Sequence, residues 1–288
     1  MNNPREETKY VPQPATNLIP ERELGKQLIL EAHNLGIDFG GLTAVEGFDL
    51  SVSPTEIIGL IGPNGAGKTT VFNLLSKVYQ PTRGTILMNG RDTMGMSTAQ
   101  MNRAGVARTF QNIRLFNNLT VEDNIKLGLH NHIKYGMLSG ILRLPNYWKQ
   151  EKEAKERVTE LLSIFSMTHM APFRAGALPY GAQRRLEIIR ALATGPKVLL
   201  LDEPAAGMNP SETSELMENI VKVRDTFQIA VVLIEHDMNL VMGICEGICV
   251  LNFGKIIAKG TPSEIQNNPV VIEAYLGRQK EDGQNAES

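Results

Sequence analysis

A glycine-rich loop at residues 62–69 has the residue types and spacing that bind phosphate groups. The loop reads GPNGAGKT, fits the pattern G-x-x-x-x-G-K-[ST], and lies between a short apolar run, 56–61, and a segment with helical periodicity. Its glycines let backbone N–H groups approach phosphate oxygens, and the helix N-terminus adds partial positive charge. We expect Lys68 to neutralise the β- and γ-phosphates and Thr69 to bind Mg²⁺. The predicted nucleotide-binding residues are Gly62, Pro63, Asn64, Gly65, Ala66, Gly67, Lys68, Thr69 and Thr70.

An acidic pair follows a second apolar run, and its chemistry complements that of the loop. Residues 198–203 read VLLLDE, so Asp202 and Glu203 end a predicted buried strand. Asp202 is placed to bind Mg²⁺ directly or through water, and Glu203 is the natural general base for an attacking water. Any strand can end in acidic residues, so the pair gains its meaning from the phosphate loop in the same chain. Together they predict ATP hydrolysis.

Short apolar runs and amphipathic segments predict the elements that position these groups. The runs 198–201 and 229–234 read as buried parallel strands with chemistry at their carboxyl ends, and 28–32 and 48–52 as further strands. The segment after the loop places apolar residues at i, i+3, i+4 and i+7, which predicts a helix. Its apolar stripe is Val71, Leu74, Leu75 and Val78.

Helical character dominates the middle of the sequence. Between Gln111 and Gly176 a charged segment carries apolar residues on one side, namely Val158, Leu161, Leu162 and Phe165. Asn209-Pro210 and Thr261-Pro262, each with a glutamate at the third helical position, predict two capped helix starts.

Composition limits the function classes. The chain has 288 residues, of which 42% are hydrophobic, and a formal net charge of −2, so a large core is possible and a basic nucleic-acid footprint is not indicated. We expect the two cysteines, Cys245 and Cys249, to be buried thiols rather than metal ligands. Residues 1–27 and 279–288 are polar, and we expect a disordered leader and tail.

Membrane-spanning segments are not predicted. No run of residues approaches the ~18–20 apolar positions that cross a bilayer, and the N-terminus lacks the apolar core of a secretory signal. We expect a cytosolic or peripheral protein, with any membrane span supplied by another chain.

The order and spacing of the motifs resemble those of ABC (ATP-binding cassette) ATPases over about residues 28–277. The motifs are the phosphate loop, Gln111, the segment 178–183, the acidic pair and His236. The resemblance implies an α/β fold, with a P-loop NTPase (RecA-like) core, an antiparallel β subdomain and an inserted α-helical subdomain. It implies a single ABC ATPase domain at 28–278, with the helical subdomain at about 112–190.

The family's site roles carry over to matching residues. Phe39 resembles the aromatic that stacks on adenine, Gln111 the residue that senses Mg²⁺ and the γ-phosphate, and His236 the switch histidine that aligns the water with Glu203. A core phenylalanine, a solvated glutamine and a structural histidine are the ordinary alternatives. By resemblance the catalytic set is Glu203, His236 and Gln111, and the metal set is Thr69, Gln111 and Asp202.

The signature segment departs from the family pattern. In the family, ATP lies between two head-to-tail subunits, and each phosphate loop faces a Leu-Ser-Gly-Gly-Gln segment of the other. This chain reads LPYGA at 178–182, so Gly181 keeps the second glycine, whereas Pro179 has neither a hydroxyl nor an N–H to donate. A missing donor to phosphate costs about 1.5–3 kcal/mol. We expect a slower or asymmetric ATPase rather than an inactive one.

Longer stretches resemble one subgroup, the ATP-binding subunits of branched-chain (hydrophobic) amino-acid importers, with urea or amide importers close by. They are RTFQ at 108–111, DEPAAGMNP at 202–210, IEHDM at 234–238 and AYLG at 274–277. The resemblance implies ATP and Mg²⁺ as cofactors, and membrane permease subunits and a second ATP-binding subunit, identical or different, as partners. It also implies an indirect link to a periplasmic substrate-binding protein, no nucleic acid, and a peripheral place on the cytoplasmic face of the inner membrane. A permease helix is expected on the surface at 111–120.

Other ABC classes fit less well. A DNA-repair ATPase needs a long coiled coil inserted in the cassette, and a translation factor normally carries two cassettes in one chain. A lipid or lipopolysaccharide exporter motor shares the same motifs and is the nearest functional rival. Neighbouring genes for a binding protein and two permeases would favour import. The residues His130-Asn131-His132 read as a polar loop.

Overall fold

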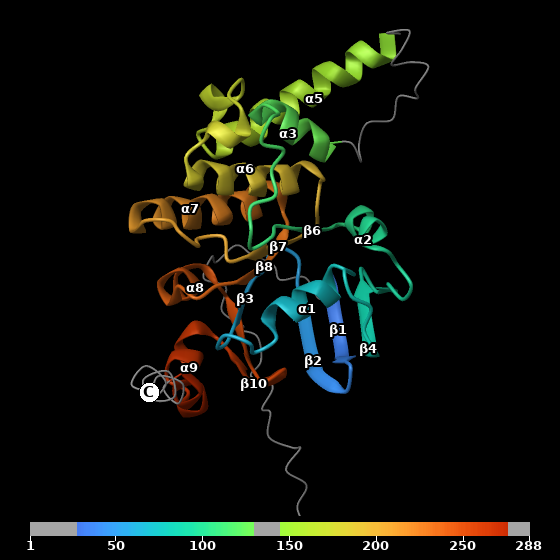
Figure 1. The fold of residues 1–288 in the computed structure, drawn as a ribbon, viewed down its shortest axis with the longest axis vertical. Helices are drawn as coiled ribbons and strands as arrows, with labels where there is room; N and C mark the ends of the chain where they lie inside the picture. Colours follow the sequence, from blue (N-terminus) through green and yellow to red (C-terminus); the bar gives the residue numbers. More distant parts are fainter. Residues whose placement is uncertain (1–27, 130–144, 276–288) are drawn as a thin grey trace, which may run out of the picture. The chain divides into compact units, whose positions relative to one another are not determined.

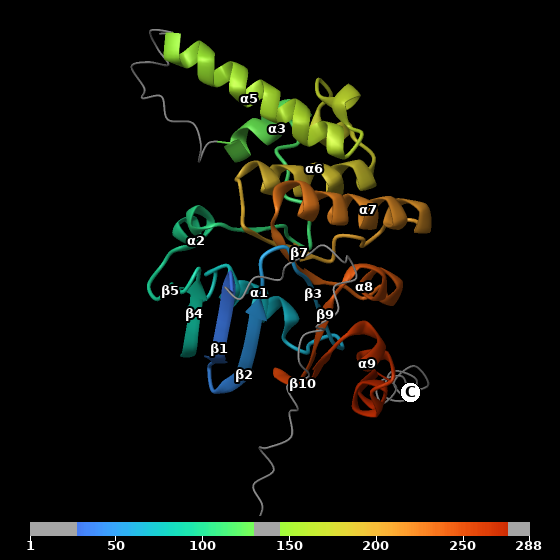
Figure 2. The ribbon, with the colours of Figure 1, turned by 180° about the vertical axis from the view of Figure 1, so that it is seen from behind.

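The computed structural model describes residues 28–129 and 145–275, and these form two compact units (Figures 1 and 2). Unit 1 comprises the described residues of Met1–Met101 and Ala230–Ser288, and unit 2 those of Asn102–Ile229. The predicted leader, the tail and the polar loop 130–132 lie outside the described residues. None of the described helices is long and apolar enough to cross a membrane.

Unit 1 contains an antiparallel sheet in the order β2-β1-β4-β5 (Figure 1). The strands are β1 (Leu30–Phe39), β2 (Leu42–Val52), β4 (Arg83–Met88) and β5 (Arg91–Asp92). The predicted strands 28–32 and 48–52 lie side by side at the open end of a longer hairpin, because Leu30 pairs with Val52. Register shifts after Ala32 break the alternation of side chains, which hid the rest of β1 from a pattern of period two.

The other strands of unit 1 place the phosphate loop at their carboxyl end. β3 (Ile57–Ile61) runs parallel to β8 (Ala230–Ile234) and to β9 (Gly247–Asn252), and β10 (Lys255–Gly260) is antiparallel to β9. Every residue of β3 and β8 is buried, which confirms the prediction from their continuous apolar runs. The helices here are α1 (Lys68–Leu75), α8 (Met238–Ile244) and α9 (Pro262–Gln266), and residues 269–275 are also helical.

The helix after the phosphate loop is shorter than predicted. Val71, Leu74 and Leu75 are fully buried, as expected, but α1 ends at Leu75. Lys77 has a left-handed backbone, with φ of 58°, and turns the chain out of the helix before Val78. Val78 is therefore 45% exposed, and its assignment to the apolar stripe was wrong.

Unit 2 combines two parallel strands with a set of helices. β6 (Val106–Arg108) pairs with β7 (Val198–Asp202), and the helices are α3 (Val121–Gly128), α5 (Pro145–Ile164), α6 (Tyr180–Ala193) and α7 (Pro210–Phe227). Two short 3-10 turns, Thr168–Met170 and Ala175–Ala177, join α5 to α6, and α2 (Thr98–Ala104) crosses the boundary between the units. α6 packs against α3 and α5 (Figure 2).

The predicted helix signals are confirmed in both units. Val158, Leu161, Leu162 and Phe165 are buried on one face of α5 and the turn after it. Both predicted capping boxes form, with Asn209 accepting from the Glu212 N–H and Thr261 from the Glu264 N–H. Each box satisfies otherwise unpaired N–H groups at the helix start.

Candidate nucleotide site

The phosphate loop of unit 1 connects β3 to α1 and folds around its own lysine. Lys68 is only 6% exposed, and its Nζ donates to the carbonyl oxygens of Gly62 at 2.6 Å and Pro63 at 3.0 Å. Asn64 and Gly65 are exposed at the tip of the loop, and the N-cap residue Gly67 has a left-handed backbone. The ammonium group therefore lies inside a ring of main chain that a phosphate group fits.

Three neighbouring segments hold this loop in its path. A Cβ atom at Gly62 would lie 2.1 Å from the Leu251 carbonyl oxygen, so β9 approaches too closely for any side chain there. The Gly254 N–H, in the turn between β9 and β10, donates to the Ala66 carbonyl at 2.9 Å. The Tyr275 hydroxyl is hydrogen-bonded to the Gly62 backbone. The loop conformation is thus set mainly by main-chain contacts.

The other two predicted site residues of unit 1 are accessible. Phe39 ends β1 and is 43% exposed, with its ring edge-on to Tyr79 at a centroid distance of 5.3 Å. His236 follows β8 and is exposed, and its N–H donates to the Glu235 carboxylate at 3.1 Å. Neither residue is a core side chain.

Asp202 ends β7 in unit 2, where a buried ion pair fixes it. It is 1% exposed, and its Oδ2 accepts from Arg108 Nη2 at 2.8 Å. Its N–H donates to the Thr109 hydroxyl at 3.2 Å. Its Oδ1 is buried and has no hydrogen-bond partner among the residues that the structure describes. A buried carboxylate oxygen without a hydrogen-bond partner, such as Asp202 Oδ1, is suited to bind Mg²⁺.

Glu203 is held in an unusual backbone conformation beside Gln111. Its φ is 48°, in the left-handed region, which costs an ordinary residue roughly 1–2 kcal/mol. Its Oε2 accepts from the Gln111 side-chain amide at 3.0 Å. The structure thus brings together two of the three predicted catalytic residues, and it orients the carboxylate of Glu203 through Gln111.

The signature segment begins α6 and packs on the start of α7. Pro179 is the N-cap residue and makes no side-chain cap hydrogen bond. Gly181 is buried, and a Cβ atom there would lie 2.8 Å from a Glu212 carboxylate oxygen. The Tyr180 ring covers Gly207. A side chain at either glycine would push these two segments apart.

Sequence reasoning missed the buried charges that hold unit 2 together. Arg108 pairs with Asp202, and Arg184 pairs with Glu187 within α6. The available signal was weak: an arginine and a glutamate three residues apart on one helix, a spacing that is also common on solvent-exposed faces.

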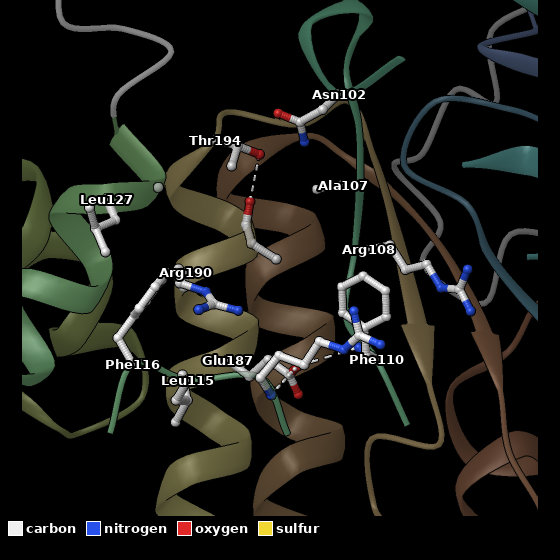
Figure 3. A pocket seen from close by; sticks show the side chains of 13 residues that line it. Asn102, Ala107, Arg108, Phe110, Leu115, Phe116, Leu127, Glu187, Arg190 and Thr194 are labelled. Atoms are coloured by element: carbon white, nitrogen blue, oxygen red, sulfur yellow. Dashed lines mark hydrogen bonds between the residues drawn. The ribbon is translucent and has the colours of Figure 1, made fainter. Parts of the chain in front are cut away.

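A cavity of about 610 Å³ also lies in unit 2, between α6 and the chain before α3 (Figure 3). Its wall includes Phe110, Phe116 and Leu127, and Arg190 and Glu187 project into it from α6. Burial lowers the pKa of Arg190, and the opposing effect of the neighbouring Glu187 carboxylate is smaller. The exposed surface of the cavity is mostly apolar, and charged side chains, among them Arg190 and Glu187, lie at its wall.

A glycine-rich loop between a parallel strand and a helix, and an acidic pair at the end of another strand, define a P-loop nucleotide-binding protein. Comparison with known proteins narrows this class. The model of the ABC transporter family matches residues 45–206, and the chain belongs to this family. A second model, described as "Branched-chain amino acid ATP-binding cassette transporter", matches residues 255–281. The chain is thus an ATP-binding ABC ATPase subunit, as its motifs predicted.

Curated relatives cover most of the chain. It is 48% identical over 251 residues to "High-affinity branched-chain amino acid transport ATP-binding protein LivG" of Escherichia coli, covering 87% of this chain and 98% of the relative. It is 47% identical over 249 residues to the corresponding protein BraF of Pseudomonas aeruginosa, covering 86% and 98%. The "Lipopolysaccharide export system ATP-binding protein LptB" of Haemophilus influenzae is 33% identical, over 87% of this chain and 98% of its own.

The fold matches solved ABC cassettes. The structure described as the ADP conformation of MJ1267, an ATP-binding cassette of an ABC transporter, aligns with a TM-score of 0.75 and 27% identity. The alignment covers 87% of this chain and 99% of that one. The predicted α/β fold of the P-loop NTPase class is confirmed.

Proposed function

We propose that this chain is the ATP-hydrolysing subunit of an importer for branched-chain or other hydrophobic amino acids. The observation that carries the proposal is the 47–48% identity, over most of the chain, to two proteins named for that transport. The subgroup model at the C-terminus supports it independently of the core motifs. The exporter alternative has weaker support, because the exporter relative is only 33% identical.

In the proposed site, Phe39 stacks on adenine and residues 62–70 hold the phosphates. The ring of Phe39 is accessible for stacking. Lys68 exchanges its two carbonyl partners for β- and γ-phosphate oxygens, so its ammonium group stays hydrogen-bonded throughout. Because the loop is already formed, ATP binding costs little ordering of the chain.

Thr69, Asp202 and Gln111 are the proposed ligands of Mg²⁺, which when bound neutralises charge on the phosphates. Thr69 lies in the first turn of α1 and is exposed. The Oδ1 atom of Asp202 has no competing hydrogen bond within the described chain. Hydroxyl, carboxylate and amide oxygens are the donors that this ion prefers.

Glu203 is the proposed general base, assisted by Gln111 and His236. Glu203 takes a proton from the attacking water, Gln111 fixes the carboxylate by the hydrogen bond at 3.0 Å, and His236 holds the γ-phosphate and the water in line. The constrained backbone at Glu203 keeps its side chain at the strand end, because the turn that follows begins there.

A second ATP-binding subunit, identical or different, completes the proposed site with its residues 178–182. In this proposal the first turn of α6, which includes Gly181, faces the partner's phosphate loop, while Pro179 withholds the usual donor. ATP binding closes the pair, and hydrolysis reopens it, because ATP favours the closed form. The permeases follow these movements.

The cavity in unit 2 is the proposed seat of a permease helix. Its apolar wall at Phe110, Phe116 and Leu127 suits the apolar face of a short helix, and Arg190 suits a carboxylate on it. Three residues that line the cavity, Arg114, Leu115 and Phe116, belong to the surface 111–120 that is predicted to receive that helix. We place the assembly at the cytoplasmic face of the inner membrane, with a periplasmic binding protein delivering the substrate.

Reconstitution tests the proposal. The chain is co-purified with the permeases encoded beside it and placed in proteoliposomes with the neighbouring binding protein, and ATP-driven uptake of radiolabelled leucine and urea and export of labelled lipid are measured. The proposal predicts leucine uptake that requires ATP. Uptake of urea alone, or export of lipid, would replace it with one of the alternatives.

A further inference from the structure

Helix α6 carries a buried ion pair, Arg184–Glu187. Arg184 Nη1 and a Glu187 carboxylate oxygen are 3.1 Å apart, and each side chain is 2% exposed. Desolvating two charges costs several kcal/mol each, which their attraction offsets only when further hydrogen bonds satisfy them. The other hydrogen-bond partners of Arg184 and Glu187 therefore show what stabilises the buried pair.

Both residues of the pair are hydrogen-bonded to the main chain of one short segment, residues 110–114. Arg184 donates to the carbonyl oxygens of Phe110, at 2.7 Å, and of Gln111. Glu187 Oε1 accepts from the N–H groups of Phe110, at 3.4 Å, and Arg114, at 3.3 Å. The main chain on both sides of the Gln111 side chain is thus bonded to α6, the helix that the signature segment begins.

Two surfaces meet at this segment. On one side, the Gln111 amide holds Glu203, the proposed general base. On the other, Phe110, Arg114 and Glu187 line the cavity assigned above to a permease helix (Figure 3). A helix that enters the cavity contacts the same residues whose backbone orients Gln111.

We propose that Arg184 and Glu187 are positioning residues for hydrolysis, which transmit the position of α6 and the occupancy of the cavity to Gln111 and so to Glu203. This inference rests on the proposed function of Glu203. Neither Arg184 nor Glu187 is a proposed nucleotide ligand. Their effect falls on the rate of hydrolysis and on its stimulation by the permeases, and it leaves ATP affinity unchanged.

The test compares Glu187→Gln and Arg184→Lys with Arg185→Gln in the full complex with its permeases. Arg185 is a matched control, because it also lies on α6 but forms its ion pair with Glu215 of α7. Loss of the charge that pairs with Arg184, in Glu187→Gln, or of one of the hydrogen bonds from Arg184, in Arg184→Lys, should lower kcat and permease stimulation about tenfold, with KM for ATP within about twofold of the parent. The control should keep all three values. A kcat equal to the control in both variants would overturn the proposal.

A double substitution separates positioning from folding. Replacing a buried ion pair by apolar residues of similar volume is often neutral for stability, so Arg184→Met with Glu187→Leu should remain folded. The proposal predicts a normal melting temperature with reduced kcat. A normal melting temperature with parental kcat and stimulation would contradict it.

A mutant cycle with Gln111→Ala tests the route and separates this inference from the proposed function. If the pair acts through Gln111, Glu187→Gln should have little further effect in the Gln111→Ala background. Additive losses would overturn the route. The proposed function itself fails if Glu203→Gln hydrolyses ATP at the parental rate. If Glu203→Gln is inactive but the losses of kcat from Glu187→Gln and Gln111→Ala are additive, only the present inference fails.

Discussion

The phosphate loop of unit 1 is held mainly by main-chain contacts, whereas the residues proposed for hydrolysis in unit 2 are held by buried side-chain charges. Lys68 bonds to two carbonyl groups of its own loop, and Gly254 bonds to Ala66. In contrast, Arg108 holds Asp202, and the pair on α6 holds the backbone beside Gln111. We therefore expect nucleotide binding to depend on the path of the chain, and hydrolysis to depend on a few buried charges. Substitutions should separate the two functions.

Removal of the loop lysine should have the largest effect on binding. Lys68→Ala deletes the cation that two phosphate groups share, and hydrogen bonds to charged groups are each worth about 1.5–3 kcal/mol. We expect ATP affinity to fall by about 100-fold or more, measured by equilibrium binding of a fluorescent ATP analogue. Normal affinity would break the assignment of the loop.

A methyl group at Gly62 should weaken binding almost as much. The added Cβ atom would lie 2.1 Å from the Leu251 oxygen, so the loop must move away from β9. Overpacking costs about 1–3 kcal/mol, and we expect ATP affinity to fall by about 10- to 100-fold. Gly90→Ala is the matched control, since Gly90 also has a positive φ but no atom near its Cβ position. Equal ATP affinity of Gly62→Ala and Gly90→Ala would show that the close approach of β9 to the phosphate loop does not determine nucleotide binding.

Introducing the serine of the family's signature at position 179 should raise ATPase activity without changing the phosphate loop of unit 1. Pro179→Ser supplies the N–H and hydroxyl that the family uses towards the partner's γ-phosphate. We expect ATP-bound dimerisation or turnover to rise up to about tenfold, measured by size-exclusion chromatography and phosphate release. If neither changes, the proline is not what distinguishes this dimer.

The cysteines should show no reaction while unit 1 is folded. Burial raises the pKa of the Cys245 thiol well above its usual range, and raises that of Cys249 to about 12. Both thiols are buried, so the reactive thiolate is scarce and inaccessible. Alkylation at pH 8, followed by mass spectrometry, should modify neither cysteine in the native protein and both in denaturant. Rapid native labelling of Cys249 would show that strand β9 opens readily, and rapid labelling of Cys245 would show the same for the end of α8.

Local patterns predicted much of the fold and most of the candidate residues. The phosphate loop, the runs at β3, β7 and β8, and the two capping boxes each depend on residues close in sequence. Their spacing and hydrophobicity carry the information. The extent of β1 escaped because its bulges break the alternation on which such reading depends.

Contacts between distant residues could not be predicted in this way. Arg108 and Asp202 lie 94 positions apart in the sequence, and Arg184 reaches Phe110 across 74 positions. Nothing in the local pattern of either segment selects these partners. The left-handed backbone of Glu203 is also unexpected for a residue with a Cβ atom, and it is fixed by the strand and turn on either side.

The most direct test of the account measures ATP affinity and turnover on the same preparation of Glu203→Gln. If main-chain contacts in unit 1 bind the nucleotide and Glu203 in unit 2 acts as the base, affinity should equal that of the parent while turnover falls by about 100- to 10,000-fold. Turnover at the parental rate would contradict the account, and so would a loss of affinity that matches the loss of turnover.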